Sequence, residues 1–193
     1  MVNTAELQII VLVGVAPERA RAEPAQALAP EVSGLRSLLS RAGAVAGHAV
    51  TVVLGARAAD IAPALGRLPV SLVVNQEWRE GDAAAVRAGV ASVAGSCAAV
   101  LLLRSDQAGV SSADLQRLMD VWRRTPRSIV AAQYEGHYGL PAVVPRAEFP
   151  ALLRLRGAQG ADALLRNPAV PLTGVPMPGA APPEEEASVP TGT

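Results

Sequence analysis

The stretch AAVLLLRSDQ, residues 98–107, decides the fold class of this chain. Its first six residues are all apolar, and the run ends at Arg104, Ser105 and Asp106. A short, continuous apolar run bounded by polar residues is typical of a strand that is buried on both faces of a sheet. Further runs of this kind predict strands at residues 7–13, 49–54, 70–74 and 128–133, and weaker ones at 141–144 and 170–175.

Segments with apolar residues at helical spacing lie between these runs, at residues 32–44, 57–65, 83–93 and 112–123. In the last segment Ser112 is placed to cap the helix. The alternation predicts an α/β domain over residues 1–175: a Rossmann-like, doubly wound, three-layer α/β/α fold with a mostly parallel sheet of about seven strands. Residues 176–193, which are rich in Pro and Glu, are predicted to be a disordered tail.

The composition excludes several classes of function. The chain has 193 residues with 17 basic and 17 acidic side chains, and every basic residue is an arginine, so chemistry that needs a lysine is excluded. The absence of net charge argues against binding nucleic acid by neutralising phosphates. A single cysteine, Cys97, and two histidines make neither a disulfide framework nor a His/Cys zinc site. With no apolar run long enough to span a bilayer, we expect a cytoplasmic protein without a membrane partner.

Four stretches follow the predicted strands and helices in a specific order. They read NQEWREG at 75–81, LLLRSDQ at 101–107, YEGHYGLP at 134–141 and LRGAQGA at 155–161. In order and spacing these stretches resemble the MobA-like nucleotidyltransferases, most closely the branch of molybdenum cofactor cytidylyltransferase. The resemblance runs from about residue 49 to residue 175.

This resemblance implies a reaction and a set of site residues. The reaction is transfer of a nucleoside monophosphate from CTP or GTP to the terminal phosphate of molybdopterin, with Mg²⁺ as cofactor. It assigns Gly14, Arg19, Asn75 and Gly81 to nucleotide binding, Asp106 to the metal, and Tyr134, His137 and Gly139 to the acceptor side.

The sequence departs from the family pattern where ligands would bind. The family's glycine-rich signature, L-A-A-G-x-S-x-R-M-G followed by P-K, corresponds here to LVGVAPERAR at 12–21 and to Pro24-Ala25. Val15, Pro17 and Ala25 thus replace the glycine, the serine and the lysine. The second metal carboxylate has no counterpart, because no aspartate follows Asp162. We therefore predict a degenerate member with vestigial nucleotide-binding residues and no catalytic residue. Such a protein would act as a binding or assembly partner in molybdoenzyme maturation, with molybdopterin or a molybdoenzyme subunit as partner and with no required cofactor.

The same residues and the same fold also fit other roles and functions. Asp106 is either a metal or nucleotide ligand or a turn residue that bonds backbone amides. Arg19 and His137 also fit solvated loop residues, and Asn75 and Gly81 fit residues that a tight turn requires. The rival function is an active molybdopterin cytidylyl- or guanylyltransferase that uses Arg19 and Asp106 with Mg²⁺. A third possibility is a nucleotide-sugar transferase on the same fold.

Overall fold

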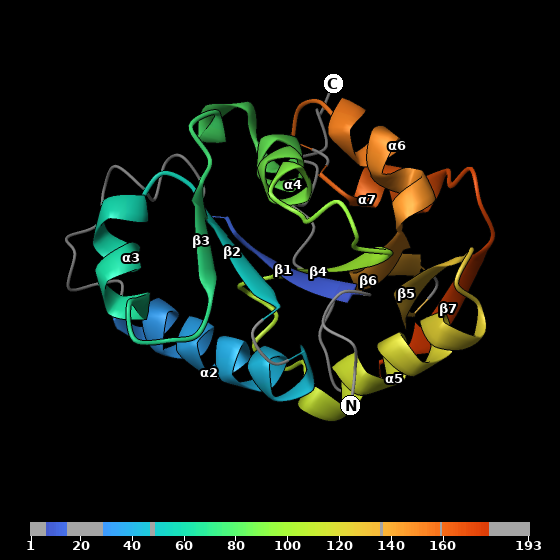
Figure 1. Ribbon diagram of the computed structural model, residues 1–193, viewed down its shortest axis with the longest axis horizontal. Coiled ribbons are helices and arrows are strands. Elements are labelled where there is room, and N and C mark those ends of the chain that lie inside the picture. Colours follow the sequence, from blue (N-terminus) through green and yellow to red (C-terminus); the bar gives the residue numbers. More distant parts are fainter. Residues whose placement is uncertain (1–6, 15–28, 47–48, 136, 159, 178–193) are drawn as a thin grey trace, which may run out of the picture.

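A computed structural model describes residues 7–14, 29–46, 49–135, 137–158 and 160–177 of the chain (Figure 1). Its centre is one seven-stranded sheet with the strand order β3-β2-β1-β4-β6-β5-β7. The strands are β1 (Leu7–Val13), β2 (Val50–Leu54), β3 (Ser71–Val74), β4 (Ala99–Arg104), β5 (Ile129–Tyr134), β6 (His137–Pro145) and β7 (Leu172–Pro176). Only β6 runs antiparallel to its neighbours, so the predicted mostly parallel sheet of seven strands is confirmed.

The middle strands are apolar because both of their faces are covered. In β1 and β4, Ile9, Ile10, Leu101 and Leu102 are fully buried, and Ile9 pairs in register with Leu101. At one edge of the sheet, β3 is short, and most of its side chains are exposed. Burial on both faces thus produces the continuous apolar runs that are visible in the sequence.

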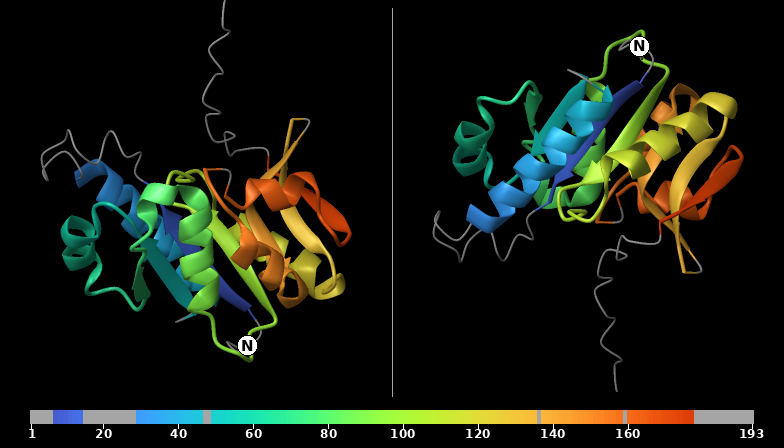
Figure 2. Two further views of the ribbon diagram at one scale, coloured as in Figure 1. Left: turned by 90° about the horizontal axis from the view of Figure 1, so that it is seen from above. Right: turned by 90° about the horizontal axis from the view of Figure 1, so that it is seen from below.

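Helices form a layer on each face of the sheet (Figure 2). One layer holds α2 (Ala29–Ala46), α3 (Ala58–Leu65) and α5 (Ser112–Arg124), whose apolar residues share one core with the sheet. The other layer holds α4 (Asp82–Ala91), α6 (Phe149–Arg154) and α7 (Asp162–Arg166), which share a second core. The three-layer α/β/α prediction is confirmed. Two short 3₁₀ helices, η2 (Trp78–Glu80) and η3 (Arg146–Glu148), lie in the connections.

The helix α5 begins at Ser112, as the predicted segment does, but its N-cap lies one residue before the predicted one. Its N-cap is Ser111, whose hydroxyl oxygen accepts a hydrogen bond from the Asp114 amide at 3.1 Å. The Asp114 carboxylate accepts one from the Ser111 amide at 2.9 Å, which completes a capping box. The predicted cap Ser112 instead donates its hydroxyl hydrogen to the Arg41 carbonyl at 3.3 Å. The prediction of Ser112 as the cap is therefore wrong.

The last strand ends beyond the predicted domain boundary at residue 175. β7 extends to Pro176, and the Met177 amide donates to the Gln133 carbonyl at 3.2 Å. The Met177 side chain is buried in the core that the sheet shares with α2, α3 and α5. Residues 178–193, the rest of the predicted tail, lie outside the described part of the chain. Within the described segments, no helix is both long enough and apolar enough to cross a bilayer.

Candidate functional site

The carboxyl ends of β1 and β4 meet where the strand order of the sheet reverses, which is where ligands bind in open α/β sheets. A narrow cavity of about 20 Å³ lies there. It is lined by Leu12, Gly14, Asp82, Ala85, Arg104, Ser105 and Asp106. A side chain at Gly14 would come within 3.6 Å of the Asp82 carboxylate. The structure thus brings two predicted site residues, Gly14 and Asp106, to one cavity.

An arginine engages the carboxylate that was predicted to bind metal. Arg104 Nη2 lies 2.7 Å from Asp106 Oδ2, and its Nε lies 3.2 Å from both Asp106 oxygens. The other end of the guanidinium, Nη1, lies 3.6 Å from Asp82 Oδ2. The turn after β4 is closed by Gln107, whose side-chain oxygen accepts a hydrogen bond from the Arg104 amide at 2.9 Å. In this structure Asp106 is therefore the ion-pair partner of Arg104.

A third carboxylate belongs to the same electrostatic group. Burial raises the pKa of Asp162, the first residue of α7, while the charges of Arg104 and Arg166 lower it. Burial likewise raises the pKa of Asp82, with Arg104 lowering it and Asp106 raising it. Arg104 thus interacts electrostatically with three aspartates at this edge of the sheet, and Arg166 is a second cation near Asp162.

These residues do not fit a magnesium site as they are arranged. Mg²⁺ prefers oxygen ligands in octahedral geometry, usually one or two carboxylates with waters and phosphates. Here a guanidinium already bonds both oxygens of Asp106. Among the residues that the structure describes, no three His, Cys, Asp or Glu side chains come close enough to hold a metal ion.

The other predicted nucleotide residues have structural roles in the β3–α4 connection. Asn75 is buried, and its side-chain oxygen accepts a hydrogen bond from the Glu77 amide at 3.0 Å, which closes a turn. Gly81 has φ +96°, and a side chain there would lie 2.9 Å from the Cα atom of Ala158. The connection therefore packs directly on the loop between α6 and α7. Arg19 lies outside the described residues.

The predicted acceptor side is the hairpin formed by β5 and β6. Tyr134 is buried, and its hydroxyl donates to the Leu140 carbonyl at 2.6 Å. Burial raises the pKa of Tyr134 to about 12. Gly139 leaves room for the Tyr134 ring, whose nearest carbon is 3.3 Å from where a side chain would begin. His137 is exposed and stacks on that ring at a centroid distance of 5.6 Å. Of these three residues, only His137 is exposed to solvent.

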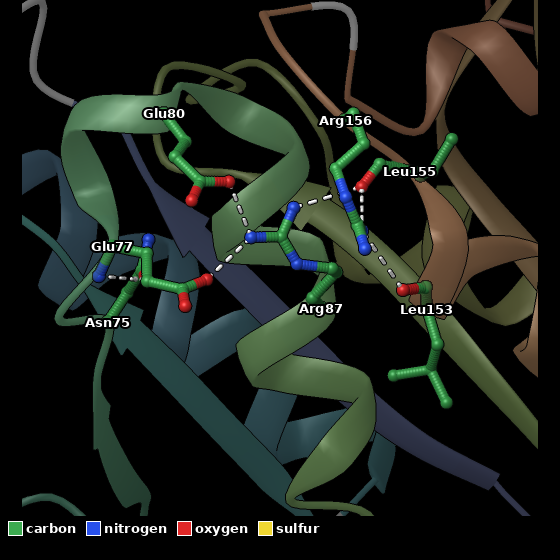
Figure 3. Close-up of polar contacts among 7 residues, drawn as sticks. All are labelled: Asn75, Glu77, Glu80, Arg87, Leu153, Leu155 and Arg156. Carbon is green, nitrogen blue, oxygen red and sulfur yellow. Dashed lines mark hydrogen bonds and ion pairs between the residues drawn. The ribbon is translucent and has the colours of Figure 1, made fainter.

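A second and larger recess lies beside Arg87 of α4 (Figure 3). It has a volume of about 520 Å³ and is lined by Glu77, Glu80, Arg87, Arg156 and Gly157. Sequence reasoning missed Arg87, Arg156, Asp82 and Asp162. Three of them carried a signal: Asp82 directly follows the NQEWREG stretch, Arg156 lies within the LRGAQGA stretch, and Asp162 directly follows it. Arg87 carried none.

Comparisons with known proteins agree with this architecture. Residues 10–172 match the family model of the MobA-like NTP transferase domain. No curated protein matches the sequence. The crystal structure of Rv0371c from Mycobacterium tuberculosis H37Rv is similar at a TM-score of 0.74 and 24% identity, over 90% of this chain and 89% of that one. Its complex with manganese is similar at a TM-score of 0.71 and 22% identity, over 89% and 88%.

A further similar structure is molybdopterin-guanine dinucleotide biosynthesis protein A from Archaeoglobus fulgidus. The TM-score is 0.61 at 14% identity, over 88% of this chain and 83% of that one. At such identities these likenesses establish the fold only. The family model covers most of the chain and includes the strand-end motifs described above. The chain belongs to the MobA-like NTP transferase domain family.

Proposed function

We propose that this protein is a degenerate member of its family, linked to molybdenum cofactor maturation in the cytoplasm, where it binds or assembles partners instead of transferring nucleotides. The observation that carries the proposal is the ion pair between Arg104 and Asp106, with Nη2 and Oδ2 2.7 Å apart. In the family pattern the carboxylate at this position holds the metal, and here it holds an arginine.

The charges at the carboxyl ends of the strands support the proposed loss of nucleotidyl transfer. Nucleotidyl transfer requires cations around the triphosphate and free carboxylates for the metal ion. Three carboxylates, of Asp82, Asp106 and Asp162, lie near two guanidinium groups, of Arg104 and Arg166, so the described part of this edge carries more carboxylates than cations. Such a surface disfavours a triphosphate. Val15, Pro17 and Ala25 in the sequence act in the same direction, because they remove the glycine, an amide donor and the lysine of the family signature.

The link to the molybdenum cofactor is supported by the four motif stretches, which resemble the cytidylyltransferase branch. The partner we propose is molybdopterin or a molybdoenzyme subunit. The second candidate function is an active cytidylyl- or guanylyltransferase that uses CTP or GTP with Mg²⁺. Its support is that Gly14 and Asp106 line one cavity at the strand ends.

Nucleotide binding separates the two candidates. We would titrate the protein with CTP and with GTP in the presence of Mg²⁺ by calorimetry, and repeat the titration with Asp106→Ala. Asp120→Ala is the matched control, because Asp120 is also an ion-paired aspartate but lies on α5, away from the cavity. We expect no binding at millimolar nucleotide. Micromolar affinity that Asp106→Ala abolishes and Asp120→Ala preserves would show an active site and refute the proposal.

The partner role is tested separately, with the protein as bait, by capturing molybdoenzyme subunits from a lysate of cells that make them. The full chain should enrich such a subunit over a control that carries residues 178–193 alone. Equal capture by the two baits would remove the support for an assembly role.

A further inference from the structure

The two outer strands of the sheet, β7 and β3, differ in what they offer to a further strand. At β7, the Met177 amide donates to the Gln133 carbonyl at 3.2 Å, so the preceding residue, Pro176, turns its backbone away from β5. Proline has no amide hydrogen, and a proline on the outer side of an edge strand hinders pairing with another chain. None of the four residues of β3 is a proline. The β3 edge therefore lacks this protection.

The outer side of β3 carries both backbone groups and apolar side chains. The Asn75 amide donates to the Leu54 carbonyl of β2 at 2.8 Å. Because successive residues of a strand turn their backbone groups to opposite sides, Leu72 and Val74 turn their amides and carbonyls away from β2. No described strand pairs with that side, and the side chains of both residues are exposed. β3 can therefore form backbone hydrogen bonds with one more strand.

The segment around β3 carries almost no charge. Residues 58–76, from the start of α3 to the turn after β3, contain only two charged residues, Asp60 and Arg67. Asp60 is paired with Arg57 at 2.6 Å. Charged side chains, lysine above all, are the usual means by which edge strands avoid pairing with another chain, and β3 has none. This surface thus suits burial against another strand.

A second copy of β3 fits this edge because the segment is self-complementary about Leu72. When two β3 strands pair antiparallel about a two-fold axis at Leu72, each Leu72 faces the other, and Val74 of each copy faces Val70 of the second copy. The Leu72 amides then donate to each other's carbonyls. The Val74 amide reaches the Val70 carbonyl of the second copy. Every side-chain pair at these positions is apolar.

The charges at the two ends of β3 also favour an antiparallel second copy. Arg67 lies five residues before Leu72, and Glu77 lies five residues after it, so antiparallel pairing brings Arg67 of each copy toward Glu77 of the other. Arg67 is exposed and takes part in no ion pair among the described residues. Glu77 uses only Oε2 for Arg87 (Figure 3), so Oε1 is available to a second cation. Parallel pairing would bring like ends together.

We propose that the protein forms a two-fold symmetric homodimer in which the β3 strands pair antiparallel about Leu72 and join the two sheets into one. Because β3 has only four residues, the interface is small and the dimer is reversible. None of the interface residues lines the cavity at Asp106, so the dimer does not depend on the proposed function.

The first test is analytical ultracentrifugation of the full chain over a wide range of protein concentrations. We expect the wild type to pass from monomer to dimer as the concentration rises. Leu72→Lys should raise the dissociation constant at least tenfold, because two lysines would face each other at the two-fold axis. Leu153→Lys is the matched control, since it changes an exposed apolar residue on α6 and should leave the dimer intact. Thermal unfolding of dilute samples shows whether each variant keeps the fold.

Charge reversal tests the antiparallel arrangement. Arg67→Glu and Glu77→Arg should each weaken the dimer about tenfold, because two opposite-charge pairs become two like-charge pairs. A mixture of these two variants should dimerise about as tightly as the wild type, since each contact then joins opposite charges again. Arg154→Glu, at an exposed arginine of α6, should have no effect. The proposal is overturned by a wild type that stays monomeric at every concentration, by a dimer that Leu72→Lys leaves intact, or by a mixture that dimerises as weakly as its components.

Discussion

At the scale of single residues, two helical glycines have opposite surroundings. At Gly34 in α2, an added side chain would meet no described atom within 4 Å. At Gly89 in α4, it would lie 2.7 Å from Ile10 Cγ2 and 3.1 Å from Val53 Cγ2, two fully buried methyl groups. Gly89 therefore allows α4 to approach the sheet closely, whereas Gly34 only lowers helix stability.

Alanine at these two positions should change stability in opposite directions. Gly34→Ala should raise the free energy of unfolding by about 0.5–1 kcal/mol, because glycine is unfavourable inside a helix. Gly89→Ala should lower it by about 1–2 kcal/mol, because overpacking of a tight core outweighs that gain. Urea denaturation of both variants gives the values. A stabilising Gly89→Ala would contradict the close packing of α4 on β1 and β2.

Because of Tyr134, the free energy of unfolding should depend on pH in the alkaline range. Its pKa is raised to about 12 by burial in the folded protein, compared with roughly 10 for a free tyrosine. Because the folded pKa is the higher one, the stabilisation is complete below about pH 10 and is lost as the pH rises through about 12. Between these pH values the wild type should lose roughly 2 kcal/mol more unfolding free energy than Tyr134→Phe.

The check on Tyr134 is urea denaturation at several pH values between neutrality and the alkaline limit. At neutral pH the same Tyr134→Phe variant should be less stable by about 1 kcal/mol, since its hydrogen bond to the Leu140 carbonyl is lost. Parallel pH curves for the two proteins would show that the hydroxyl does not ionise differently on unfolding.

Site residues were predictable only in part from the sequence, for a physical reason. The motif around Asp106 identified the right loop, because the loop directly follows a clear apolar strand. The ion pair with Arg104 was not predictable, since residues two apart in a strand-end turn can point either way. Asp82 and Asp162 reach this group through the packing of α4 and α7, which no local pattern encodes.

At the scale of elements, the cap of α5 provides a direct test. Ser111→Ala should lower the free energy of unfolding by about 1 kcal/mol, because the Asp114 amide loses its acceptor. Ser112→Ala should cost less, since its hydroxyl makes one bond of 3.3 Å to the Arg41 carbonyl. Chemical denaturation of both variants measures the difference. A larger loss in Ser112→Ala would place the cap at Ser112 after all.

Helix length explains which elements the sequence predicted. The helices α2, α3, α4 and α5 span enough turns to repeat an apolar pattern, and each was predicted. The six residues of α6, with Pro150 near its start, and the five of α7 are too short for such a pattern. Both were missed, although their apolar residues, Phe149, Leu152, Leu164 and Leu165, complete the second core.

At the scale of the whole molecule, the sheet has an exposed edge at β3. Leu72 is 39% exposed and Val74 is 49% exposed there, on a strand whose outer side no described strand pairs with. Val74→Lys should reduce aggregation on heating and change the free energy of unfolding by less than about 0.5 kcal/mol. Light scattering during a temperature ramp measures the effect. Leu153→Lys, which changes an exposed apolar residue on α6, should protect less.

The strands of the sheet were predictable from the sequence because most of them are buried and apolar, and because the exposed edge strand β3 is still a short apolar run. The order of the strands and the antiparallel direction of β6 were not, since both depend on pairing between distant segments. Ile9 and Leu101 pair across β1 and β4, yet they lie far apart in the chain.

The direction of the strands has a practical consequence for surface-based binding measurements. Because β7 runs parallel to β5, and both run with β1 and β4, Gly14 and Met177 lie at the same edge of the sheet as the Asp106 cavity. Leu7 begins β1 at the opposite edge. A protein immobilised on a sensor chip through Leu7, at the start of β1, should therefore present the Asp106 cavity to the flowing solution. Attachment through Met177 would instead bring the cavity close to the chip surface.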